Sequence, residues 1–214
     1  MLIITDAEMG FSGKSLFGPL SLKVEGGQIA LLQAPSGAGK STLLHWICGT
    51  PPPGLHASGQ IHLDGKDITS LPAEDRQVGI MFQEALLFPH LTVGGNLAFG
   101  IPGSVPERER QRRISDTLAR VGMPDMADRD PMTLSGGQKA RISLMRSLMA
   151  EPQAILLDEP FSSLDPEIRE EFSAFIRQEI ELRRLPAVLV SHDPRDQEMA
   201  TGPLYRLPET GGKM

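Results

Sequence analysis

The chain has 214 residues, of which 40% are hydrophobic, and this suits one domain or a domain with an inserted subdomain. Its formal net charge of -6 at pH 7 excludes a general nucleic-acid binder, because contact with a phosphate backbone needs a basic face. The one cysteine, Cys48, excludes an internal disulfide and fits a reducing compartment. The N-terminus lacks a signal-peptide pattern, and no apolar run approaches the ~20 residues of a membrane span, so we expect a soluble, cytoplasmic protein.

Short apolar runs of strand length recur along the chain. They lie at residues 2–4, 29–32, 78–82, 154–157 and 187–190. The last two are apolar at every position, which is typical of strands buried on both faces of a parallel sheet. Residues 60–63 followed by Asp64 and Gly65 indicate a strand that enters a hairpin turn. We therefore expect an antiparallel sheet in the N-terminal part beside a parallel one.

Helical patterns lie between these runs. Residues 40–49 follow a loop, and residues 107–121, 138–150 and 167–182 carry apolar side chains at helical spacing. The segment from 84 to 150 has helical signals and no clear strand. It is interpreted as a helical subdomain inserted into an α/β core. Trp46 and Cys48 lie on the first of these helices and are interpreted as packing residues.

Residues 33–42 read QAPSGAGKST, after an apolar strand and before a helix. They match the phosphate-binding pattern G-x-x-x-x-G-K-[ST], except that Ala34 stands at the first glycine. The backbone N–H groups of such a loop form an anion nest, which the helix N-terminus reinforces. The alternative is a chance glycine-rich turn. The nucleotide-binding residues expected here are Ala34, Pro35, Ser36, Gly37, Ala38, Gly39, Lys40, Ser41 and Thr42.

The positions of this loop have different tasks. Gly37 and Gly39 lie where the backbone must approach phosphate, whereas Ala34 lies where the strand ends. We therefore expect a negative φ and a β-like conformation at Ala34, with any unusual dihedral at Gly37 or Gly39. Lys40 supplies a charge to the outer phosphates, and the Ser41 hydroxyl is placed to ligate Mg²⁺.

Residues 154–160 read AILLDEP, so two acids end an apolar strand. Asp158 at the end of a buried strand beside a phosphate loop can hold Mg²⁺ through water. Glu159 is expected to face elsewhere, because strand side chains alternate, and it can act as the base that polarises an attacking water. The alternative is an ordinary strand end with solvated acids.

Residues 134–138 read LSGGQ, and with the two motifs above they make the chain resemble the ATP-binding-cassette family. MFQ at 81–83, SSLD at 162–165 and VLVSHD at 188–193 follow the order of that family's further motifs. The resemblance implies one nucleotide-binding domain over residues 1–214. Its fold class is α/β: a P-loop NTPase parallel-sheet core with an N-terminal antiparallel β subdomain, in residues 1–84 and 151–214, and an inserted helical subdomain, in residues 85–150.

The resemblance also implies a homodimer in which two copies hold two ATP molecules head to tail. The signature residues of one copy, which are Ser135, Gly136, Gly137 and Gln138, would then meet the nucleotide on the phosphate loop of the other copy. Gln83 would sense Mg²⁺ and the attacking water, and His192 would contact the γ-phosphate and orient Glu159. Asp165 would connect the two sites. The implied catalytic residues are Glu159, His192 and Gln83, and the implied Mg²⁺ ligands are Ser41, Gln83 and Asp158.

The adenine of ATP should stack on an aromatic ring ahead of the phosphate loop. Phe11 is the best match to that position, and Phe17 is the second choice. A plain core role is the alternative for either residue.

LLFPHLTV at 86–93 and PFSSLD at 160–165 resemble ATPase subunits of bacterial importers for thiamine, ferric iron, molybdate, sulfate and polyamines, and an uncharacterised bacterial subgroup. The resemblance implies a membrane permease that contacts residues 83–93, a periplasmic solute-binding protein, and a peripheral place on the inner face of the cell membrane. Phe88, Pro89 and Leu91 would dock on the permease, or else pack within the helical subdomain.

The expected function is therefore ATP binding and hydrolysis that powers uptake of a small solute. An ATPase of an exporter, or of a lipoprotein- or division-type membrane complex, is the alternative, because it differs only in its partner. A nucleic-acid-linked cassette is a further alternative, but the negative charge and the single cassette count against it. No nucleic-acid partner is expected.

Overall fold

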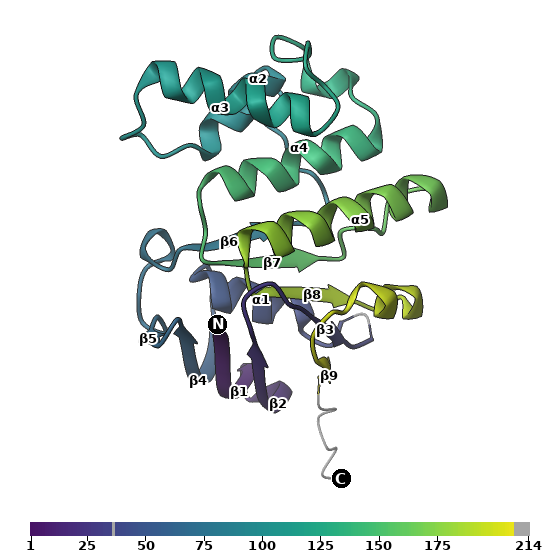
Figure 1. Ribbon diagram of the computed structural model, residues 1–214. Helices are drawn as coiled ribbons and strands as arrows, with labels where there is room; N and C mark the ends of the chain where they lie inside the picture. Colours follow the sequence, from purple (N-terminus) through teal and green to yellow (C-terminus); the bar gives the residue numbers. More distant parts are fainter. Residues whose placement is uncertain (36, 208–214) are drawn as a thin grey trace. The chain divides into compact units, whose positions relative to one another are not determined.

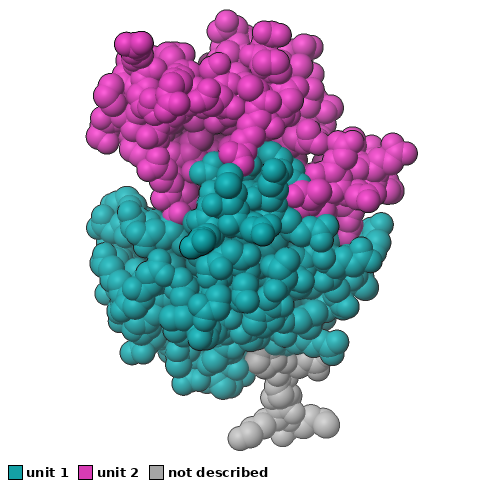
Figure 2. All heavy atoms as spheres, in the orientation of Figure 1, with its two compact units in different colours: residues 1–80, 153–159, 175–214 teal, residues 81–152, 160–174 magenta. Residues whose placement is uncertain are grey.

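The computed structural model describes residues 1–35 and 37–207 (Figure 1). They form two compact units (Figure 2). Unit 1 comprises residues 1–80, 153–159 and 175 to the last described residue, and unit 2 comprises residues 81–152 and 160–174. Among the described residues, no helix has the length and apolar character needed to cross a membrane. The interpretation of the two units as subdomains of one cassette, with boundaries at 84/85 and 150/151, stays a prediction.

Unit 1 contains a four-stranded antiparallel sheet. Its order is β2-β1-β4-β5, with β1 at Leu2–Phe11, β2 at Lys14–Val24, β4 at Leu55–Leu63 and β5 at Lys66–Asp67. Leu63 pairs with Lys66, and the two residues between them, Asp64 and Gly65, have φ values of 49° and 82°. Positive φ at both central residues is the mark of a type I′ hairpin turn. The antiparallel sheet and its turn are confirmed.

Unit 1 also contains a five-stranded sheet of order β6-β7-β8-β3-β9. Its strands are β3 (Ile29–Gln33), β6 (Val78–Met81), β7 (Ala154–Asp158), β8 (Ala187–Ser191) and β9 (Leu204–Arg206). β7 and β8 are buried at every position, as their continuous apolar runs predicted. The chain therefore has the α/β fold of a P-loop NTPase.

Parallel pairing brings the carboxyl ends of three strands to one edge of the sheet. Gln33 is paired with Ser191, and Asp158 is paired with Val190. Side chains that follow these strands consequently meet at that edge, where open α/β sheets bind their ligands. Helix α1 (Lys40–Cys48) starts there, after the loop that follows β3.

Unit 2 contains helices α2 (Val93–Gly100), α3 (Glu107–Arg120) and α4 (Gly136–Met149), together with the first half of α5 (Pro166–Arg183). A Cβ at Gly100 would lie 2.1 Å from the Arg146 carbonyl oxygen, so the glycine allows α2 to approach α4 closely. Helix α2 was not expected, because its sequence VGGNLAFG is poor in helix formers. Thr92 caps its N-terminus by accepting a hydrogen bond from the Gly95 N–H.

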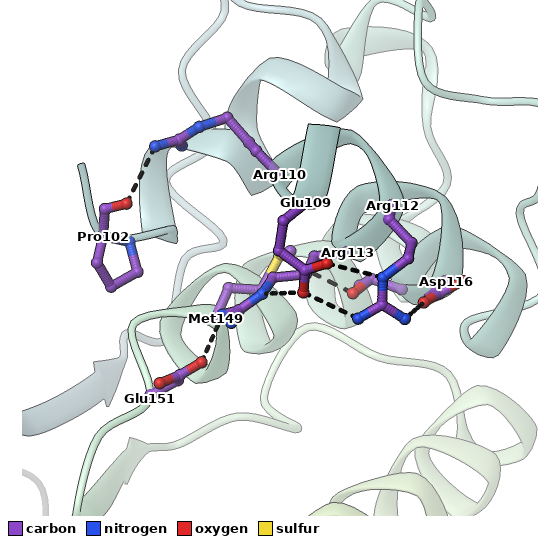
Figure 3. A network of polar contacts seen from close by, with 9 residues as sticks. Pro102, Glu109, Arg110, Arg112, Arg113, Asp116, Met149 and Glu151 are labelled. Atoms are coloured by element: carbon purple, nitrogen blue, oxygen red, sulfur yellow. Dashed lines mark hydrogen bonds and ion pairs between the residues drawn. The ribbon is translucent and has the colours of Figure 1, made fainter. Parts of the chain in front are cut away.

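A polar network ties α3 to the segments around it (Figure 3). Glu109 accepts hydrogen bonds from Arg112 and Arg113, and these bonds lower the pKa of its carboxyl to about 2. Arg113 also pairs with Glu151, which follows α4, and Arg110 donates to the Pro102 carbonyl. Arg112 and Arg113 of α3 are thus paired with acids of unit 2.

Arg76 is a buried cation in unit 1, with an exposed fraction of 6%. Its guanidinium donates to the carbonyls of Trp46 and Ile47 in the last turn of α1, at 2.7 and 3.1 Å, and the Trp46 carbonyl also accepts from the Gly49 N–H. It also donates to the carbonyls of Leu71 and Thr69 at 2.8 and 2.6 Å. Burial lowers the pKa of Arg76, and the four carbonyls offset the cost of that burial.

We predict that Arg76→Ala lowers the free energy of unfolding by about 2–4 kcal/mol, because several buried carbonyls lose their donor. Urea unfolding followed by circular dichroism measures the change. The matched control is Arg177→Ala, since Arg177 is exposed and makes one carbonyl contact at 3.2 Å. Equal unfolding midpoints for the two variants would contradict the capping role of Arg76.

Trp46 and Cys48 are each 7% exposed, in agreement with the packing interpretation. Burial raises the pKa of the Cys48 thiol to about 12. The thiol is therefore protonated at neutral pH and is a poor nucleophile.

Candidate functional site

The phosphate loop connects β3 to α1 in unit 1. Gly37 and Gly39 have φ values of 80° and 94°, and among the described residues Ala34 is not one of those with positive φ. The φ of Gly39 favours glycine, and a Cβ there would lie 3.1 Å from the Phe17 ring, which is closer than an ordinary van der Waals contact. The expected signs of φ are confirmed at these positions, whereas the β-like conformation of Ala34 stays a prediction. Ser36, expected to bind phosphate, lies outside the described residues.

Lys40 is held in place by the loop that it follows. Its ammonium donates to the carbonyls of Ala34 and Pro35 at 2.8 and 3.2 Å, and it lies 3.3 Å from Glu159 Oε1. The side chain is 6% exposed, so the cation is largely withdrawn from water. A fixed, desolvated cation at a helix start is suited to an anion such as a phosphate.

Asp158 and Ser41 are in contact at the same edge of the sheet. The Ser41 hydroxyl hydrogen-bonds to the Asp158 carboxylate, and Asp158 is 8% exposed. Burial raises the pKa of Asp158, whereas the bond from Ser41 and the nearby Lys40 act in the opposite direction. A carboxylate next to a hydroxyl is an oxygen donor set that fits Mg²⁺.

Glu159 has a backbone conformation that the sequence did not indicate. Its φ is 46°, and its N–H donates to the Val190 carbonyl at 3.0 Å. A left-handed conformation at a non-glycine residue costs about 1–2 kcal/mol. We had expected strand alternation to turn Glu159 away from Asp158. That reason does not apply, because β7 ends at Asp158 and the left-handed backbone at Glu159 sets the direction of its side chain.

His192 follows β8 and meets Glu159. Its Nδ1 lies 3.1 Å from Glu159 Oε1, the same oxygen that Lys40 approaches. Because an ionised carboxylate only accepts, the imidazole Nδ1–H is the donor. The structure therefore brings together Lys40, Glu159 and His192, which lie far apart in the sequence, around one carboxylate oxygen.

The two aromatic candidates differ in accessibility. Phe17 is 0% exposed and packs in the core of unit 1, so the plain core role applies to it. Phe11 is half-buried at the end of β1, where it pairs with Lys14 and Leu55. Phe11 stays the predicted stacking residue, because unlike Phe17 it is not fully buried.

The signature segment belongs to unit 2 and starts α4. Ser135 is the N-cap: its Oγ accepts from the Gln138 N–H at 3.3 Å, and Gln138 Oε1 accepts from the Ser135 N–H at 3.0 Å. This capping box could have been recognised from the spacing of Ser135 and Gln138. A Cβ at Gly137 would lie 2.5 Å from Ile168, whereas a Cβ at Gly136 would meet nothing closer than 3.8 Å. Packing therefore requires Gly137 and leaves Gly136 exposed at a helix N-terminus.

Gln83 and Asp165 are exposed residues of unit 2. Their implied roles stay predictions. Asp165 precedes α5, and its carbonyl accepts from the Arg169 N–H at 2.8 Å.

The segment after Gln83 is anchored within unit 2. The buried Asn96 side chain accepts from the Phe88 N–H at 2.8 Å and donates to the Phe88 carbonyl at 3.1 Å. The Phe88 ring lies 4.6 Å from that of Phe99. Phe88 and Leu91 are half-buried, whereas Pro89 is exposed.

Two exposed apolar side chains, one within this segment and one in α2, were not singled out by the sequence analysis. Leu86 is 51% and Phe99 is 67% exposed. Phe99 was missed because α2 was not expected. Such exposed apolar groups are typical of a partner surface.

Comparison with known proteins gives concordant matches. The family model described as "ABC transporter" matches residues 17–162. The chain is 39% identical over 196 residues to an uncharacterized ABC transporter ATP-binding protein, YnjD, of Escherichia coli K12, covering 92% of this chain and 90% of that protein.

Two matched relatives are named as import proteins. The chain is 41% identical over 204 residues to the sulfate/thiosulfate import ATP-binding protein CysA of Escherichia coli K12, covering 92% of this chain and 54% of that protein. It is 42% identical over 182 residues to the Fe(3+) ions import ATP-binding protein FbpC 1 of Rhizobium meliloti, covering 85% and 50%. The chain thus spans about half the length of these two import proteins.

Proposed function

This chain belongs to the ABC transporter family, and on that premise we propose that it is the ATP-hydrolysing subunit of an importer, which powers uptake of a small solute through a separate permease. The observation that carries the catalytic part is the meeting of Lys40, Glu159 and His192 beside the phosphate loop. The import names of two relatives support the direction of transport. The exporter alternative has no comparable support.

In the proposed mechanism, the loop N–H groups and Lys40 hold the phosphates of ATP, and Phe11 stacks on the adenine. The Glu159 carboxylate accepts a hydrogen bond from the attacking water and polarises it toward the γ-phosphorus. His192 holds Glu159 through Nδ1 and contacts the γ-phosphate. Ser41 and Asp158 would hold Mg²⁺, which when bound would supply positive charge beside the phosphates. The role of Gln83 as a further ligand stays a prediction from the resemblance.

A second copy completes the site in this proposal. The exposed Ser135 and Gly136 at the start of α4 present donors to the γ-phosphate bound by the other copy, with Gly137 and Gln138 fixing the helix start. Asp165 connects the two sites across the dimer. This arrangement makes hydrolysis depend on dimerisation.

The proposed partners lie at and across the membrane. Residues 83–93, which include the exposed Leu86, form together with Phe99 the surface that docks on the permease. Docking on the permease keeps the subunit on the inner face of the membrane. A periplasmic solute-binding protein delivers the solute to the permease.

The binding part of the proposal is tested with Lys40→Ala. We expect ATP to bind about 10- to 100-fold more weakly, because a charge-assisted contact to phosphate is lost, and hydrolysis to fall to background. Titration with a fluorescent ATP analogue and a phosphate-release assay measure both effects. Lys66→Ala, an exposed change on β5, is the control. Unchanged ATP affinity in Lys40→Ala would contradict the proposed site.

A further inference from the structure

Ser191 and Asp196 form a buried polar pair close to His192 in the chain. Ser191, the last residue of β8, is 2% exposed, and Asp196, in the 3₁₀ helix Pro194–Met199, is 3% exposed. The Ser191 hydroxyl donates to Asp196 Oδ2 and accepts from the Asp193 N–H at 2.9 Å. The three contacting residues therefore bracket His192 in the chain.

The pair restrains the backbone on both sides of His192. A serine hydroxyl has one proton and rotates freely until that proton finds an acceptor. Here the Ser191 O–H donates its hydrogen bond to Asp196, so the hydroxyl oxygen is left to accept from the Asp193 N–H, two residues along the chain. The resulting turn spans His192 and fixes the peptide groups before and after it.

The 3₁₀ helix that carries Asp196 is itself attached to the phosphate-loop side of the sheet. Gln197 Nε2 donates to Gln33 Oε1 at 3.2 Å, and Gln33 is paired with Ser191 in the ladder between β3 and β8. Asp193 accepts from the Arg195 N–H at 2.9 Å, which closes the start of the 3₁₀ helix. Hydrogen bonds therefore hold the chain both before His192, at Ser191, and after it, at Asp193.

We propose that Ser191 and Asp196 are positioning residues that hold His192 Nδ1 against Glu159. This inference rests on the proposed function, in which His192 orients Glu159 for the attack of water. Burying a carboxylate costs free energy unless hydrogen bonds offset that cost. The buried Asp196 carboxylate accepts from the Ser191 hydroxyl, and that hydroxyl in turn fixes the turn around His192. In this proposal both residues act through His192 rather than on ATP itself.

The sharpest test compares Ser191→Thr with Ser191→Val, because the two side chains have nearly the same shape and differ in the hydroxyl. Threonine keeps the donor and suits a strand, so we expect kcat within about 2-fold of the unchanged protein. Valine removes the donor, and we expect kcat to fall about 10-fold or more, because a displaced catalytic group loses rate steeply. The affinity for ATP should change less than about 2-fold in both.

Double variants separate positioning from a general loss of structure. In a His192→Ala background, Ser191→Val should lower kcat no further, whereas its effect on the melting temperature should remain. Asp196→Ala should behave in the same way, and Glu198→Gln, an exposed change on the same 3₁₀ helix, should leave kcat unchanged.

The outcomes distinguish the two claims. Equal kcat for Ser191→Thr and Ser191→Val, or a further loss of kcat in the His192→Ala background, would overturn the positioning role and leave the proposed function standing. Full activity of His192→Ala by itself would overturn the role of His192 in the proposed mechanism, and the positioning role with it.

Discussion

Glu159→Gln is expected to lower the rate of ATP hydrolysis by at least about 100-fold while ATP binding is retained. The amide has the shape of the carboxylate and can still accept from His192 and Lys40, which contact Glu159 Oε1 at 3.1 and 3.3 Å. It cannot polarise water as a base does. Steady-state phosphate release and titration with a fluorescent ATP analogue measure the two effects separately.

The same variant should accumulate as a dimer with ATP, because hydrolysis no longer resolves the complex. Size-exclusion chromatography with and without ATP follows this change. Glu170→Gln, an exposed change on α5, is the control for the loss of one negative charge. Hydrolysis by Glu159→Gln at the rate of the unchanged protein would show that another group activates the water.

Ser135→Arg is expected to abolish hydrolysis, by at least about 100-fold, and to leave ATP binding intact. Ser135 is exposed at the start of α4, and in the proposed dimer it meets the nucleotide held by the other copy. Loss of this N-cap costs about 1 kcal/mol of stability, so the melting temperature is recorded with the activity. Met132→Arg, three residues earlier and also exposed, controls for a new surface cation.

Mixing two inactive variants tests whether the signature acts in trans. A dimer of one Ser135→Arg copy and one Lys40→Ala copy has one site with an intact phosphate loop and an intact signature. We expect the mixture to recover hydrolysis that neither variant has alone. A mixture that stays inactive, or loss of ATP binding by Ser135→Arg, would argue that Ser135 has a structural role only.

The strands that carry the site could be predicted because their burial is uniform. β7 and β8 are buried on both faces and therefore read as unbroken apolar runs. The loop at 33–42 begins at the end of β3, and Asp158 is the last residue of β7, so local pattern and tertiary position agree. The signature and the implied role of His192 came from the resemblance rather than from these patterns.

Other elements could not be predicted because their stability comes from distant partners. Helix α2 is poor in helix formers and depends on close contact with α4 through Gly100. β2 contains Gly18 and Pro19, which weaken a strand pattern, yet it pairs along β1. Arg76 binds the carbonyl of Trp46, 30 positions away, and no local pattern marks such a contact.

The backbone conformation of Glu159 could not be predicted from the sequence either, because it also depends on distant partners. Its left-handed φ is compensated by the bond from its N–H to Val190 and by the contacts of its carboxylate with Lys40 and His192. These partners come from β8, from the residue that follows Ser191, and from the start of α1. Strain of this kind is found where a site orients a reacting group.

The central claim, that ATP hydrolysis by this subunit drives uptake through a permease, is tested most directly in proteoliposomes. The permease that co-purifies with the chain from its own cells is reconstituted with this subunit, and ATP hydrolysis and solute accumulation are measured together. We predict that hydrolysis rises when the solute and its binding protein are present, and that solute crosses toward the side of the subunit. A rate of ATP hydrolysis that is the same with and without the permease, its solute and the binding protein would contradict the proposal. Solute transport away from the side of the subunit would contradict it as well.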